Sequence, residues 1–233
     1  MSVFLNMENE FQTSLLITSI LKDKSKSLFV PFIPNPKTSN HMEMVLVSNE
    51  NYTCYEDIVS SWGVDSWGIP IPRVEFGDER DLAYFFDSEV YSEKKGNLTT
   101  LPPTPHTKKE VKSLDLILMP GLLFSESEFT RLGQGKGFYD VYLERAFRFH
   151  ESLKLADSAN SVIVDDCACA STPPKLVALA YREQLVTKEE EEQFVASVGE
   201  KGRAVPCDQW DFKIDGICSE DGVVLGRNVK SRK

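Results

Sequence analysis

The feature that most constrains the fold is an unbroken apolar run that leads through a glycine-rich loop into a helical pattern. The run, Leu114 to Met119, suits a strand that is buried on both faces of a parallel sheet. Downstream of the loop, apolar residues recur at helical spacing, at Tyr142, Leu143, Ala146 and Phe147. Alternation of strand and helix is the building plan of α/β proteins, so this segment predicts that class.

The same alternation extends along the chain. Strands are predicted at 2–5, 27–32, 42–47, 176–181, 216–218 and 223–225, and a helix at 188–198 whose first turn is rich in glutamate. Thr13 is expected to cap a further helix that has an apolar side made of Leu16, Ile17, Ile20 and Leu21. The prolines of 67–72 force extended backbone. Met42 and Met44 alternate on their strand and are expected in the core. We expect one α/β domain over 1–233 with a mainly parallel sheet.

Two segments show neither the helical nor the strand spacing of apolar residues, and both contain clustered prolines. They are 73–110 and 152–174, and both are expected to be surface insertions with little regular structure.

Composition narrows the class of function. Hydrophobic residues make up 41% and charged residues 27% of the chain, which is typical of a globular protein with a packed core. The formal net charge of -10 disfavours nucleic acid and anionic membranes as partners. No apolar run is long enough to cross a bilayer, and the start does not resemble a secretory signal, so the cytosol is expected. The odd number and irregular spacing of the cysteines favour reduced thiols over disulfides; they are Cys54, Cys167, Cys169, Cys207 and Cys218. A C-x-C pair without a second close pair is a weak zinc signal.

The loop from Arg131 to Asp140 carries the chemistry that the sequence predicts. Glycines at alternate positions allow the backbone to approach phosphate oxygens, and the start of the following helix offers free N–H groups to an anion. Arg131 and Lys136 add positive charge, and Asp140 is placed to hold a magnesium ion. The loop matches neither the P-loop nor the dinucleotide-binding fingerprint. The alternative is a glycine-rich turn that only connects strand to helix.

The string R-L-G-x-G-x-G-F-Y-D at 131–140, which follows P-G-x-x-F at 120–124, resembles the signature of the 5-formyltetrahydrofolate cyclo-ligase family. Other pieces agree in order: the first strand through Glu10, the H-M-E-M-V string at 41–45, the tryptophan and proline segment at 67–72, and V-P-x-x-x-x-D at 205–211. The resemblance covers nearly the whole chain outside the two insertions.

The resemblance implies a three-layer, Rossmann-like sheet with flanking helices, similar to the NagB/RpiA/CoA-transferase-like fold. It also implies a monomeric enzyme that uses ATP and Mg²⁺ to convert 5-formyltetrahydrofolate into 5,10-methenyltetrahydrofolate. The formyl oxygen would be phosphorylated, and the ring would then close with loss of phosphate.

The family pattern assigns roles residue by residue. Lys136 and Tyr139 are expected to be catalytic, and Asp140 and Asp211 to hold the metal. The expected nucleotide contacts are Arg131, Leu132, Gly133, Gln134, Gly135, Lys136, Gly137, Phe138 and Tyr139. The expected folate contacts are Leu5, Glu10, Trp67, Gln134, Gly135, Lys136, Gly137 and Phe138. A carboxylate and an aromatic wall suit a flat, amide-like pterin.

One departure from the family leaves alternatives open. The family has a helical segment ahead of its first strand, with a Lys and an Arg that contact the nucleotide, and we expect this chain to lack it. A truncated paralogue that binds folate but is weakly active or inactive is therefore an alternative, and an organellar leader upstream of Met1 stays open. Another α/β enzyme, such as a sugar-phosphate isomerase or a CoA transferase, is a further alternative, because fold alone does not fix chemistry.

Overall fold

The computed structural model describes residues 1–34, 40–65, 67–72, 82–83, 113–158, 172–198 and 203–226. Side chains are described in these ranges except at 82–83, 152–158 and 198. Most of the predicted insertion at 73–110 lies outside the described residues, as do Cys167 and Cys169. No helix among the described residues is long and apolar enough to span a membrane.

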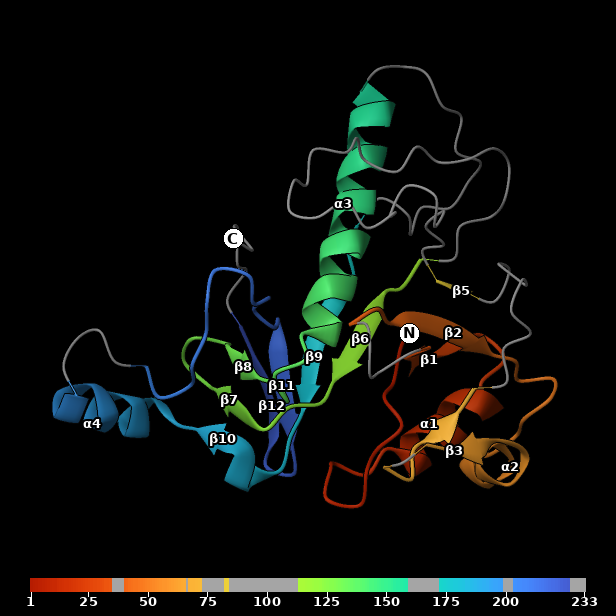
Figure 1. Cartoon of the computed structure of the whole chain (residues 1–233), viewed down its shortest axis with the longest axis horizontal. Coiled ribbons are helices and arrows are strands. Elements are labelled where there is room, and N and C mark those ends of the chain that lie inside the picture. The colour runs from red at the N-terminus through yellow and green to blue at the C-terminus, as the bar shows by residue number, and fades with distance from the viewer. Residues whose placement is uncertain are drawn as a thin grey trace.

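The centre of the fold is a parallel sheet, shown in Figure 1. Strands β6 (Leu116–Met119) and β11 (Gly216–Ser219) pair in parallel with β9 (Lys175–Leu179) between them. The predicted apolar strand is therefore confirmed, and it lies in the parallel sheet as expected. Strand β12 (Gly222–Leu225) adds to β11 in the antiparallel direction and forms an edge.

A second group of strands joins this sheet through one residue. Strands β1 (Leu28–Phe32), β2 (Glu43–Val47) and β5 (Leu82–Ala83) are antiparallel. Ser2 lies between β1 and β6 in parallel bridges to Phe29 and Ile117. Its N–H donates to Leu116 O at 2.8 Å, and its carbonyl accepts from Leu118 N at 2.9 Å. The strand predicted at 2–5 thus has regular bridging at Ser2 alone, yet this residue connects the two halves of the sheet.

Shorter strands complete the described part of the fold. Strand β7 (Leu123–Ser125) pairs antiparallel with β8 (Arg131–Leu132) and in parallel with β10 (Leu185–Val186). Strands β3 (Gly63–Val64) and β4 (Pro70–Ile71) form a hairpin. Because the outer strands are antiparallel, the sheet is mixed, and the expectation of a mainly parallel sheet holds only for its centre.

Helices cover both faces of the central strands. On one face, α3 (Phe138–Ser158) packs its buried residues Tyr142, Leu143 and Ala146 against a cluster that includes Ile117 and Ala178. On the other face, α1 (Ser14–Lys22) and α2 (Tyr55–Ser61) belong to a cluster with Leu118 and Leu179. Neighbouring residues of β6 and β9 thus enter different cores, as strand geometry requires. Met42 and Met44 are both buried, which confirms their predicted place in the core.

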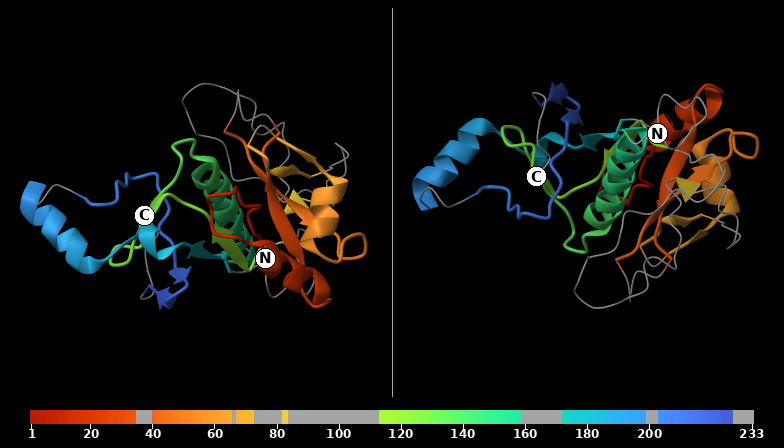
Figure 2. Two further views of the ribbon diagram at one scale, coloured as in Figure 1. Left: turned by 90° about the horizontal axis from the view of Figure 1, so that it is seen from below. Right: turned by 90° about the horizontal axis from the view of Figure 1, so that it is seen from above.

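Helix α4 (Lys188–Val198) stands apart from the sheet at one end of the molecule, as both views of Figure 2 show. Its bounds agree with the predicted helix, and three glutamates occupy its first turn. A short 3-10 helix, η3 (Arg182–Gln184), lies between β9 and β10 and was not predicted.

Three local predictions need correction. Thr13 lies at the N-cap position of α1, but its hydroxyl donates to Phe4 O at 2.9 Å and makes no capping bond. Helix α3 continues to Ser158, so the first part of the insertion expected at 152–174 is helical. Strand β5 gives regular structure to two residues of the other insertion.

Candidate active site

The loop at 131–140 and the turn around Glu10 lie at one edge of the parallel sheet. Strand β6 leads directly to Pro120 and Gly121, and β9 leads to Tyr181, so these residues leave the sheet at its carboxyl edge. Ser2 runs parallel to β6, which sends the following turn around Glu10 to the same edge. Figure 1 shows the first turn of α3 there too. Ligands of open α/β sheets bind at this edge.

Arg131 and Asp140 form a partly buried ion pair at the base of the glycine loop. The Arg131 Nη2 to Asp140 Oδ2 distance is 3.1 Å, and the side chains are 8% and 17% exposed. Arg131 Nη1 also donates to Pro120 O at 3.3 Å, and the guanidinium lies over the Tyr139 ring, 5.5 Å from its centroid. The positive charge predicted to face phosphate is therefore directed at a carboxylate inside the loop.

Asp140 has an unusual environment for a carboxylate. Burial raises its pKa, the charge of Arg131 and the N–H of Phe212 lower it, and the charge of Asp211 raises it. The Phe212 N–H donates to Asp140 Oδ1 at 3.2 Å. Because Asp211 acts on Asp140 electrostatically, the two predicted metal ligands lie in the same neighbourhood.

Glycine is required at positions 133, 135 and 137 for two different structural reasons. Gly135 and Gly137 have positive φ angles of 80° and 66°, which L side chains rarely adopt. A Cβ at Gly133 would instead lie 2.8 Å from Arg131 Nη1. Gly133 therefore makes room for the buried arginine, and the other two glycines shape the loop.

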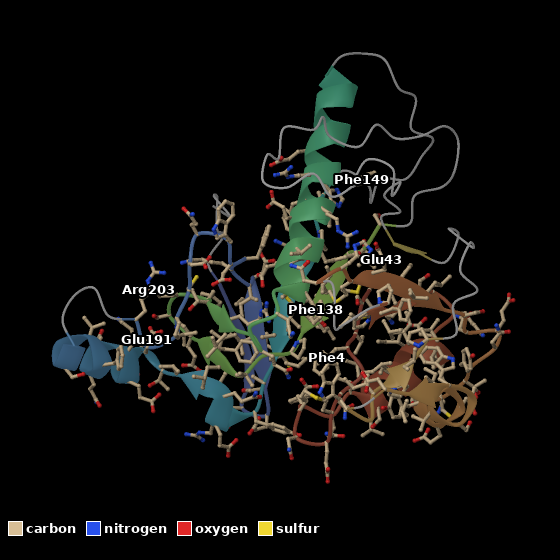
Figure 3. All side chains as sticks on the ribbon, viewed as in Figure 1. Phe4, Glu43, Phe138, Phe149, Glu191 and Arg203 are labelled. Atoms are coloured by element: carbon tan, nitrogen blue, oxygen red, sulfur yellow. The ribbon has the colours of Figure 1, made fainter. Side chains whose placement is uncertain are left out.

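The loop tip is open and the start of the helix is partly covered. Gln134, Gly135 and Lys136 are exposed, so Lys136 can reach a ligand in solvent. Phe138, at the lower end of α3 in Figure 3, packs against the core. Leu132 holds the base of the loop, because its carbonyl accepts from Leu122 N at 2.7 Å.

Tyr139 and Glu10 bring the loop and the first turn of the chain together. Burial raises the pKa of Tyr139, Arg131 lowers it, and the negative charge of Glu10 raises it further. Burial also raises the pKa of Glu10, although its carboxylate accepts from Met7 N at 2.9 Å. A predicted folate contact and a predicted nucleotide contact are thus electrostatic neighbours.

The remaining predicted folate contacts lie differently. Leu5 is 4% exposed and belongs to the core beside α1, so its side chain faces the interior. Trp67 is 54% exposed and lies at the turn of the β3–β4 hairpin, where its backbone N–H donates to the Asp65 carboxylate. Neighbouring Ile69 packs on the same core as α1 and α2. The structure therefore places Trp67 on a hairpin that is separate in sequence and core from the loop at 131–140.

Sequence reasoning missed several residues at this edge. The Gln184 side chain contacts the backbone of Tyr181 and Gly121, and the Phe212 N–H holds Asp140. An open cavity of about 660 Å³ lies beside Asp211, whose carboxylate accepts from Asp208 N. The cavity is lined by Arg203, Pro206, Cys207, Asp208 and Gln209. A backbone donor leaves no signal in a sequence, but Gln184 follows a buried strand, and that position could have indicated it.

The side chains near the loop can be compared with those that the predicted Mg²⁺ needs as ligands. Within the described ranges, no group of three or more His, Cys, Asp or Glu side chains could hold an ion. Mg²⁺ does not need one, since it is commonly bound by one or two carboxylates together with phosphate oxygens and water. Asp140 and Asp211 fit that pattern.

Comparisons with known proteins agree with the motifs. The model of the "5-formyltetrahydrofolate cyclo-ligase family" matches residues 68–220. A 5-formyltetrahydrofolate cyclo-ligase of Mus musculus is 29% identical over 221 residues, which are 94% of this chain and 72% of that protein. One from Saccharomyces cerevisiae is 26% identical over 122 residues, which are 52% of this chain and 41% of the yeast protein.

A solved structure of a 5,10-methenyltetrahydrofolate synthetase from Mycoplasma pneumoniae is 15% identical, with a TM-score of 0.39. It covers 93% of this chain and 70% of its own. Because the family model spans most of the sequence and includes the loop at 131–140, the chain belongs to the 5-formyltetrahydrofolate cyclo-ligase family.

Proposed function

We propose that this protein converts 5-formyltetrahydrofolate into 5,10-methenyltetrahydrofolate with hydrolysis of ATP to ADP and phosphate in the presence of Mg²⁺. The observation that carries the proposal is that the Glu10 turn, bonded to Tyr181 at the end of β9, and the Arg131–Asp140 pair at the start of α3 lie at the same edge of the sheet. A pterin-binding carboxylate and a phosphate-binding loop would then stand at one sheet edge. Family membership supports this pairing of substrates.

The nucleotide half of the site is the exposed loop tip. Gly135 and Gly137, in left-handed conformations, leave backbone N–H groups free of Cβ shielding, and the N-terminus of α3 adds a positive dipole. Lys136 is exposed beside them and supplies the mobile positive charge. The open cavity beside Asp211, about 660 Å³ in volume, would take the rest of the nucleotide.

Asp140 and Asp211 would hold Mg²⁺, which when bound neutralises charge on the transferring phosphoryl group. Asp140 is kept in place for this by its bonds to Arg131 and Phe212 N. Arg131 thus acts on the site through Asp140.

The folate half is the turn around Glu10. Glu10 is partly buried there, and its carboxylate in the charged form would accept paired N–H donors of a pterin. Tyr139, in the first turn of α3, would contact the formyl group. The formyl oxygen would attack the γ-phosphorus of ATP and release ADP. Attack by the N10 nitrogen on the activated carbon and loss of phosphate would then close the ring, so protein groups mainly position and neutralise.

We also propose that 1–233 is one cyclo-ligase domain with the three-layer, Rossmann-like fold implied by the family. Two observations support this. Both hydrophobic cores pack on the same strands, and helices cover opposite faces of them.

The proposal is tested by mixing the protein with 5-formyltetrahydrofolate and Mg²⁺ and following the absorbance of the methenyl product with and without ATP. We expect an ATP-dependent rise. Lys136→Ala should lower turnover about 10²-fold or more without loss of stability, because the side chain is exposed. Lys22→Ala, at an exposed position on α1, is the matched control. Folate binding without turnover would instead support an inactive paralogue.

A further inference from the structure

Tyr181 connects the end of β9 to the folate turn. Its hydroxyl donates to the backbone carbonyl of Glu10 at 3.3 Å, and its ring lies 5.4 Å from that of Phe11. The Glu10 carbonyl also accepts from the Gln12 side chain at 2.8 Å. The turn that presents the Glu10 carboxylate is therefore held from the sheet by one aromatic residue.

Gln184 connects the same segment to the other half of the site. Its Oε1 accepts from Tyr181 N at 2.9 Å, and its Nε2 donates to Gly121 O at 2.7 Å. Both ends of one amide are thus used, one toward the start of its own 3-10 turn and one toward the strand end at β6. An amide can serve as donor and acceptor at once, which few other side chains can.

Gly121 and its neighbour Pro120 link Gln184 to the side chain of Arg131. A Cβ at Gly121 would lie 3.1 Å from Arg131 Cγ, so a larger residue here would collide with the arginine side chain. Arg131 in turn donates to the neighbouring Pro120 carbonyl and pairs with Asp140. Continuous contacts therefore run from the Glu10 turn through Tyr181, Gln184 and Gly121 to Arg131.

We propose that Tyr181 and Gln184 are positioning residues that fix the spacing between the folate turn and the nucleotide loop and thereby couple the binding of the two substrates. This inference rests on the proposed function, since it takes Glu10 and the loop at 131–140 as the two half-sites. Both residues act through backbone carbonyls, at Glu10 and Gly121. When one ligand orders its half-site, the fixed spacing prepares the other half.

Binding measurements separate this role from a merely structural one. Calorimetry gives the Kd of 5-formyltetrahydrofolate alone, of a non-hydrolysable ATP analogue with Mg²⁺ alone, and of each in the presence of the other. For the unmodified chain we expect each ligand to tighten the other about 5-fold or more, equally in both directions. In Gln184→Leu this factor should fall to about 1, while the Kd of each ligand alone changes less than about 3-fold. If Gln184 only supported the fold, its substitution would instead raise the Kd of both ligands and lower the melting temperature.

Two further variants complete the test. Tyr181→Phe keeps the ring against Phe11 and removes only the hydroxyl, so coupling should fall here too even where Gln184→Leu folds poorly. Glu183→Gln, an exposed position in the same turn, is the control and should keep the full factor. Coupling that persists in both variants, or no coupling in the unmodified chain, would overturn the positioning role. Failure of the unmodified chain to bind either ligand would instead overturn the proposed function.

Discussion

Helix α3 takes part in two buried pairs of arginine and carboxylate that serve different ends. Near its start, Asp140 pairs with Arg131, which lies in the preceding loop. Further along, Arg145 pairs with Glu43 of β2 at 2.8 Å and also donates to Met42 O. Figure 3 labels Glu43 beside the helix. The first pair joins residues close in sequence, and the second joins segments that are far apart.

The surroundings of the two pairs show why they differ. Glu43 Oε1 accepts from both His41, at 2.7 Å, and Arg145, and the Arg145 guanidinium lies 5.5 Å from the Tyr142 ring centroid. This pair holds a strand to a helix. Asp140 instead lies at the sheet edge, with a pKa raised by burial and by Asp211. A carboxylate with a raised pKa beside a loop is expected to serve ligand binding. We therefore expect the Arg145–Glu43 pair to support the fold and the Arg131–Asp140 pair to support the proposed site.

The largest expected effect is a loss of stability when the Arg145–Glu43 pair is broken. Glu43→Gln leaves the buried Arg145 charge without its carboxylate, so stability should fall by about 3–5 kcal/mol in urea unfolding. Turnover per folded molecule should change little. Glu192→Gln, which breaks an exposed pair with Lys188 on α4, is the control and should cost less than about 0.5 kcal/mol. Equal losses in the two variants would show that the Glu43 pair does not hold β2 to α3.

For the Arg131–Asp140 pair we expect the reverse: a large loss of turnover and a small change in stability. Asp140→Asn should lower turnover about 10²- to 10³-fold, because the proposed metal ligand loses its charge. Stability should change by less than about 1 kcal/mol, since the amide still accepts one hydrogen bond. The sign of the pKa shift agrees: a carboxyl whose pKa is raised on folding favours the folded state below that pKa and loses this contribution as the pH rises. Removing the charge therefore offsets the lost ion pair. A large loss of stability with normal turnover would reverse the two roles.

A third prediction tests the folate half through pH. Burial raises the pKa of Glu10, so its carboxylate takes up a proton at higher pH than an ordinary glutamate. If the charged form accepts the pterin N–H groups, folate affinity should fall as the pH is lowered through this pKa. Glu10→Gln should weaken binding about 10- to 100-fold and flatten the pH dependence. Titration of the Kd from calorimetry over a pH series measures both. An unchanged pH profile in the variant would exclude Glu10 as the titrating contact.

Local patterns were sufficient for much of the fold. The apolar run became β6 and the helical spacing became α3, because each pattern reports burial of one face or both. Helix α4 also has its predicted bounds, although none of its described residues is buried. The continuation of α3 to Ser158 was not predicted, because that segment lacks a clear apolar stripe. A helix that has already formed extends at little cost, so tertiary context decides where it ends.

The site was less accessible to sequence reasoning. Residue types in the loop indicated anion and metal chemistry, but the direction of Arg131 depends on a turn geometry that the sequence does not display. The Ser2 bridge and the Gln184 amide each rest on a few hydrogen bonds and leave no periodic trace. Such single contacts between distant segments can be found only once the chain is folded.

The smallest expected effect separates the two kinds of glycine in the loop. Gly135 has a φ of 80° and open space where a Cβ would point, so Gly135→Ala should cost about 1–2 kcal/mol through backbone strain alone. Gly135→Asn should cost less, because asparagine tolerates this conformation better. A Cβ at Gly133 would meet the Arg131 guanidinium, so Gly133→Ala should move the arginine off Asp140 and lower turnover, while stability changes by about 1 kcal/mol. Urea unfolding and turnover of the three variants together measure this. Equal costs for alanine and asparagine at position 135 would mean that packing, and not φ, selects glycine there.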